Sequence, residues 1–63
     1  MEFINELIKS KNGQIVRTQE IYGYASMKGI NRIELMYHLS KTPQIMPCKS
    51  RGKIIGFRWI ENA

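Results

Sequence analysis

The side chains that could perform catalysis or bind a metal are few. The 63 residues include one cysteine, Cys48, one histidine, His38, and no aspartate. A structural zinc site takes about four Cys or His ligands, so this pair cannot form one. Cys48 has only Lys49 and Arg51 nearby to activate it as a nucleophile, and His38 is expected to pack or cap near the end of a helix. We therefore predict that the protein is not an enzyme and has no metal site and no cofactor.

The basic side chains are a more informative group. Ten Lys or Arg residues and five acidic residues give a net charge of +5. From Met1 to Met27 three acids balance three bases, whereas from Lys28 onwards seven bases meet two acids, so the whole excess of five lies in the second half. Such asymmetry favours a polyanionic partner, with nucleic acid ahead of a membrane surface. The alternative is a solvated face that keeps the protein soluble.

Cysteine content and hydropathy bear on the cellular compartment. A single cysteine excludes an internal disulfide and fits a reducing environment. No apolar run approaches the roughly 18–20 residues that cross a bilayer. The first residues, MEFINELIK, lack the basic start and apolar stretch of a signal peptide. We expect a cytoplasmic protein with no membrane partner, associated with the nucleoid if the polyanion is DNA.

Apolar spacing and cap residues predict the first elements. A helix over residues 2–11 has its apolar residues on one side and ends at the Asn12-Gly13 pair. The β-branched stretch 14–17 is long enough only for a brief strand. A second helix, over residues 18–27, is expected to start with Thr18 as its N-cap.

A third helix is predicted over residues 31–41. Gly29 supplies the turn before it, and Asn31 is the expected N-cap. Glu34 follows the cap by three residues, which is the spacing of a capping box. Three residues have the spacing for burial in the core: Leu35, Met36 and Leu39.

The last third of the chain predicts a β-hairpin over residues 44–60. Residues 49–52 (KSRG) are interpreted as its turn, and 53–60 (KIIGFRWI) as a β-branched and aromatic strand. The strand alternation predicts that Ile55, Phe57 and Trp59 face the core. The whole chain, residues 1–63, is therefore expected to be a single α+β domain.

Residues 18–39, TQEIYGYASMKGINRIELMYHL, resemble the winged helix-turn-helix proteins of bacterial and phage regulators. Ala25 matches the small residue where the two helices of that motif meet, Gly29 the turn glycine, and Leu35 the buried aliphatic residue. Lys28 departs from the motif, which usually has an apolar residue there, and so does Gly23 within the helix. The resemblance implies three helices, a short strand between the first two, and a C-terminal hairpin that forms the wing.

The same resemblance implies sequence-specific binding of double-stranded DNA by a transcriptional regulator or an accessory factor of a phage or mobile element. The third helix would enter the major groove, with Lys28, Asn31 and Arg32 at its leading end, where Asn31 would read adenine and Arg32 guanine. The wing would lie on the backbone or in the minor groove. The expected partner is duplex DNA, bound by a monomer or a homodimer. Two alternatives remain: a protein-interaction module, such as a phage-type inhibitor of a host nucleic-acid-processing protein, and an RNA-binding protein. The residues expected to contact DNA are Thr18, Gln19, Lys28, Asn31, Arg32, Tyr37, Lys41, Lys49, Ser50, Arg51 and Lys53.

Overall fold

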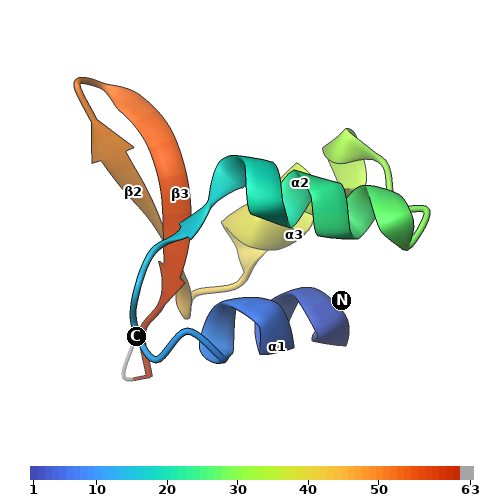
Figure 1. Ribbon diagram of the computed structural model, residues 1–63, viewed down its shortest axis with the longest axis horizontal. Helices are drawn as coiled ribbons and strands as arrows, with labels where there is room; N and C mark the ends of the chain where they lie inside the picture. The colour runs from blue at the N-terminus through green and yellow to red at the C-terminus, as the bar shows by residue number, and fades with distance from the viewer. Residues whose placement is uncertain (62–63) are drawn as a thin grey trace.

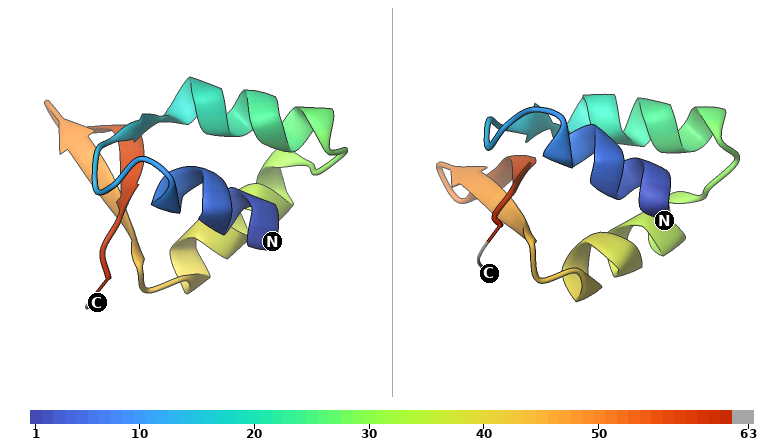
Figure 2. Two further views of the ribbon diagram at one scale, coloured as in Figure 1. Left: turned by 60° about the horizontal axis from the view of Figure 1, so that its bottom comes forward. Right: turned by 90° about the horizontal axis from the view of Figure 1, so that it is seen from below.

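The computed structural model describes residues 1–61 of the chain. Three helices gather at one end of the molecule, and a hairpin stands at the other (Figure 1). The turn between the second and third helices lies at the end opposite the hairpin in every view (Figure 2). In chain order the elements are α1 (Glu2–Lys9), β1 (Val16–Arg17), α2 (Thr18–Met27), α3 (Arg32–Lys41), β2 (Ile45–Ser50) and β3 (Lys53–Trp59).

The strands form one antiparallel sheet in the order β1-β3-β2. β1 contributes two residues, Val16 opposite Phe57 and Arg17 opposite Gly56. Because β1 is so short, the outer half of the hairpin extends past it as a two-stranded ribbon. The predicted α+β class, with a short strand between the first two helices, is confirmed. The arrangement is compatible with a winged helix.

Two predicted boundaries are wrong near the first loop. α1 ends at Lys9 instead of residue 11, because Asn12 itself adopts a left-handed conformation with φ of 54° and turns the chain away. The strand predicted over residues 14–17 is limited to its last two residues, since the Gln14 N–H donates to the Lys11 carbonyl at 3.1 Å within the turn.

The second helix covers residues 18–27 as predicted, but Thr18 does not cap it. The N-cap is Arg17, whose backbone is extended and whose side chain makes no cap hydrogen bond. Thr18 is already the first helical residue. Its Oγ1 is buried and has no hydrogen-bond partner among the described residues. The predicted N-cap, Thr18, is therefore wrong by one residue.

The hairpin turn is tighter than the predicted span of residues 49–52. Only Arg51 and Gly52 lie between the strands, with φ of 52° and 78°. Two left-handed residues in succession match the twist of a hairpin, as in a type I′ turn. Pro47 lies within β2, which the fold tolerates because β2 is an edge strand.

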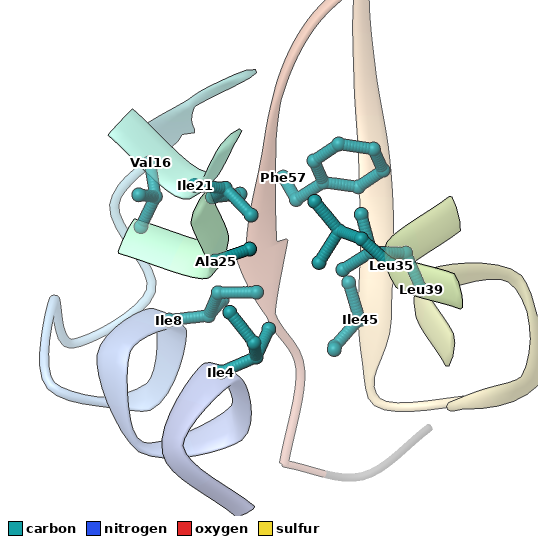
Figure 3. Close-up of a cluster of buried hydrophobic side chains, with 9 residues drawn as sticks. All are labelled: Ile4, Ile8, Val16, Ile21, Ala25, Leu35, Leu39, Ile45 and Phe57. Atoms are coloured by element: carbon teal, nitrogen blue, oxygen red, sulfur yellow. The ribbon is translucent and has the colours of Figure 1, made fainter. Parts of the chain in front are cut away.

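The core lies between the helices and the inner face of the sheet (Figure 3). Met36 and Ile55, which were expected there, are 38% and 46% exposed. Ile55 is displaced by a bulge: Cys48 pairs with Gly56 and Lys49 with Ile54, so Ile55 is the extra residue and the alternation shifts. Trp59 is half-buried against the core. The buried residues are Ile4, Ile8, Val16, Ile21, Ala25, Leu35, Leu39, Ile45 and Phe57.

Candidate functional site

The start of α3 is fixed by Asn31, the predicted N-cap. The Glu34 carboxylate accepts from the Asn31 side chain and not from its backbone N–H, as it would in a complete capping box. The Glu34 N–H donates to Asn31 Oδ1 at 2.8 Å, and Asn31 Nδ2 donates to Glu34 Oε1 at 3.3 Å. Both polar atoms of the Asn31 side chain are thus engaged within the first turn of the helix.

Arg32 packs on an aromatic ring. Its guanidinium carbon lies 4.8 Å from the centroid of the Tyr22 ring on α2, a cation–π geometry. The Tyr22 hydroxyl in turn lies 3.2 Å from Met36 Sδ, one helical turn after Arg32. These contacts tie one side of α3 to α2. Glu34, the acid nearest to Arg32 in the sequence, is hydrogen-bonded to Asn31.

The outer face of α3 is mixed, with exposed apolar side chains beside exposed charged ones. Ile33 is 83% exposed and Tyr37 is 66% exposed. Lys41 extends along this face with its Nζ 5.6 Å from the centroid of the Tyr37 ring. Tyr37 and Lys41 were predicted for the site, whereas Ile33 was missed. The signal was available, because Ile33 is two residues, or about 200° around the helix, from the buried Leu35.

Lys28 does not join Arg32 and Asn31. Its Nζ lies 5.9 Å from the Phe3 ring centroid on α1 and 5.8 Å from the Tyr24 ring centroid on α2. The three residues that the sequence grouped at the start of the third helix therefore have different roles: Lys28 covers α1, Asn31 caps α3, and Arg32 packs on α2.

The hairpin carries the densest positive charge in the described chain. Lys49 and Ser50 end β2, Arg51 is in the turn, and Lys53 begins β3, and all four are exposed. Arg58, exposed on β3, adds a cation that the sequence prediction omitted. No acidic residue occurs between residues 45 and 60. The predicted hairpin contacts thus gather around the hairpin turn, with Lys49 and Lys53 on opposite faces of the two-stranded ribbon.

An open groove joins the hairpin to the start of α2. The predicted residues Thr18 and Gln19 line it together with Arg17, which the sequence prediction omitted. Three isoleucines that are 41–47% exposed also line it: Ile15, Ile54 and Ile55. The groove is therefore lined by basic, polar and apolar side chains.

His38 connects α1 to α3 instead of facing solvent. Its Nε2 lies 2.8 Å from Asn5 Oδ1, an acceptor, so the ring donates this hydrogen bond. The Thr42 hydroxyl donates to the His38 carbonyl at 2.9 Å and closes the end of the helix. Burial lowers the pKa of His38 below its ordinary value of 6.5, and the ammonium group of Met1 acts in the same direction.

Within residues 1–61 no three His, Cys, Asp or Glu side chains are close enough to hold a metal ion. None of the helices described is long and apolar enough to cross a membrane. No protein-family model, curated protein or solved structure matches the chain. Its function is therefore inferred from the chemistry and geometry of its own residues.

Proposed function

We propose that the protein binds double-stranded DNA as a winged-helix module. The observation that carries this proposal is the β2–β3 hairpin, which extends past β1, exposes Lys49, Arg51, Lys53 and Arg58, and has no acidic residue. Clustered cations without acids bind phosphate backbones by releasing condensed counterions. The hairpin is the wing of the proposed module, on the backbone or in the minor groove.

The helices support the same mode of binding. α2 and α3 are joined by a tight turn at Gly29, whose φ is 76°, and Ala25 is buried close to this turn. Helix-turn-helix modules use such a pair to insert the second helix into the major groove. In this proposal α3 enters the groove with its exposed face, and the first turn of α2, with Thr18 and Gln19, approaches a phosphate.

The proposed biological role is regulation by occupancy of a DNA site. A single module buries only about 600–1,000 Å² of its surface on DNA, which limits affinity. We therefore propose that two copies bind a palindromic site, with half-sites about one helical turn apart.

The experiment is selection from a random duplex library, followed by binding curves on the recovered site and a scrambled one at several salt concentrations. A recovered motif and a steep linear fall of log K with log salt are expected. Matched single-stranded DNA and duplex RNA test the alternative nucleic acids. Binding that is weak and independent of salt for every nucleic acid would refute the proposal.

A protein-docking module is the second candidate, and one observation favours it. The groove beside α2 exposes Ile15, Ile54 and Ile55 together, and clustered apolar side chains on a surface mark interaction sites. One variant of this groove distinguishes the two candidate functions. Ile54→Ser would abolish partner binding by a docking module, whereas in a DNA-binding module it would leave the salt dependence of duplex binding unchanged.

A further inference from the structure

The side chains that α3 presents to the outside differ from those expected of a helix that recognises bases by hydrogen bonds. Asn31 and Arg32 were the predicted readers of adenine and guanine. Among the apolar and aromatic side chains of the helix, the most exposed are Ile33, at 83%, and Tyr37, at 66%. Both lie on the face opposite the buried Leu35 and Leu39.

The two predicted polar readers are already engaged. A bidentate contact to adenine uses both the oxygen and the nitrogen of an asparagine side chain. In Asn31 these atoms bond to the Glu34 N–H and carboxylate, at 2.8 and 3.3 Å. The cap thus holds this side chain against the first turn of α3, with one lone pair and one N–H left over. Arg32 lies over the Tyr22 ring and would have to leave it to reach a guanine.

Apolar side chains have one partner among the base edges of the major groove. Only thymine presents a methyl group there, so an aliphatic side chain can distinguish it by contact. Cations lie at both ends of the exposed face of α3, Arg32 and Lys41, and outnumber its one acid, Glu34, whose carboxylate accepts a hydrogen bond from Asn31. This charge, with the basic hairpin, complements a polyanionic duplex better than the surface of an ordinary protein.

Resting on the duplex binding proposed above, we infer that Ile33 recognises thymine through its C5-methyl group, with Tyr37 packed beside it. The preferred site then contains thymine under the first two turns of α3. Specificity at these positions comes from burial of a methyl group and not from hydrogen bonds.

Uracil substitution tests this directly, because uracil differs from thymine only by the missing methyl group. In the selected duplex each thymine is replaced in turn by uracil, and Kd is measured at fixed salt. At one or two positions the affinity should fall about fourfold, which is roughly the free energy lost when one buried methyl group is removed from the contact.

The protein side of the contact is tested with Ile33→Ala. This variant should bind the thymine duplex about as weakly as the wild type binds the uracil duplex, and uracil should then have no further effect. Met27→Ala is the matched control, since Met27 is 81% exposed but belongs to α2. It should leave both affinities and the uracil effect unchanged.

The possible failures are distinguishable. If duplexes bind with the expected salt dependence but uracil has no effect at any position, the thymine inference is wrong and duplex binding stands. A uracil effect that persists in Ile33→Ala assigns the methyl contact to another residue and also overturns the inference. If no duplex binds, the proposed function fails first, and the exposed face of α3 becomes a candidate protein contact.

Discussion

Gly56 is the residue at which β1 approaches β3 most closely. A Cβ atom at this position would lie 2.5 Å from the Val16 carbonyl oxygen and 2.6 Å from Ile15 Cγ2. Contacts this short with a backbone atom cannot be relieved by rotating a side chain. Gly56 therefore allows the two-residue strand to pair at all, and its lack of a side chain matters more than its backbone freedom.

We expect Gly56→Ala to destabilise the protein by about 1–3 kcal/mol, the usual cost of overpacking. Gly23→Ala is the matched control. Gly23 lies within α2, and no other part of the fold comes within 4 Å of the position that an added methyl group would take. The same change there should stabilise the protein by about 0.5–1 kcal/mol. Urea unfolding of both variants gives the comparison, and equal effects would show that β1 can shift to accept the methyl group.

Sequence patterns identified the residues whose roles are local. Asn31 caps α3 as predicted, and Gly29 adopts the predicted turn conformation, because these roles depend on neighbours within four residues. Ile55 was assigned to the wrong face because a bulge depends on the pairing of two strands. The packing of Arg32 on Tyr22 was not predicted, because the two residues are ten positions apart and lie on different helices.

At the scale of elements, α1 and α3 are joined through His38. The ring donates to Asn5 Oδ1, and burial lowers its pKa below 6.5. The neutral ring is thus favoured in the folded protein, whereas the unfolded chain takes up a proton near pH 6.5. Its contribution to stability is complete above that pH and is lost as the pH falls towards the folded pKa.

Between pH 7.5 and 5.5 the wild-type protein should therefore lose more stability than His38→Gln. The glutamine amide can still donate to Asn5 but does not titrate in this range. The measurement is the urea midpoint of each protein at both pH values. All other titratable groups, including Glu2 near the ring, are the same in both proteins, so the comparison isolates His38. An equal loss in the two proteins would mean that His38 is not responsible.

The contact between α2 and α3 depends on Ala25, which is 1% exposed. Ala25→Glu should unfold the domain, because an unpaired charge would replace the smallest side chain in the core. Ser26→Glu, the neighbouring exposed position, adds the same charge and should unfold near the wild-type temperature. Thermal unfolding by circular dichroism compares them. If the Ala25→Glu variant folds, Ala25 is not the small residue at which the two helices of the motif meet.

Helices were easier to predict than strands for a physical reason. α2 has the expected bounds and α3 begins one residue after the expected start, because apolar periodicity is encoded within each helix. β1 exists only where it pairs with β3, more than 35 residues later, so its ends could not be obtained from local composition. The groove of Arg17, Thr18 and Gln19 against the hairpin was unpredictable for the same reason.

At the scale of the whole molecule, eight of the ten cations fall into two groups, and only Lys11 and Arg17 belong to neither. Lys9, Lys28, Arg32 and Lys41 each lie over an aromatic ring, at 4.8 to 5.9 Å from its centroid. These side chains cover the helical part of the protein and contribute to packing as well as charge. The hairpin cations instead extend from a two-stranded ribbon with a left-handed turn at its tip. The hairpin is therefore the part of the molecule best suited to approach a phosphate backbone.

The last prediction concerns this hairpin. The double variant Lys49→Ala, Arg51→Asn should weaken binding to the selected and scrambled duplexes by similar factors. Asparagine is chosen at position 51 because it tolerates the φ of 52° and preserves the turn. Phosphate contacts carry no sequence information, and each one lost should reduce the slope of log K against log salt by about 0.9.

Two single variants make the comparison independent of net charge. Lys53→Ala and Lys11→Ala each remove one exposed lysine, the first from the start of β3 and the second from the loop after α1. Only Lys53→Ala should reduce the salt slope, because long-range charge effects are screened beyond about 10 Å at 0.1 M salt. Equal slopes for the two variants would show that the hairpin contributes general charge and makes no phosphate contact. An unchanged slope in the double variant would exclude the hairpin from the DNA interface, and α3 would then have to bind the duplex without a wing.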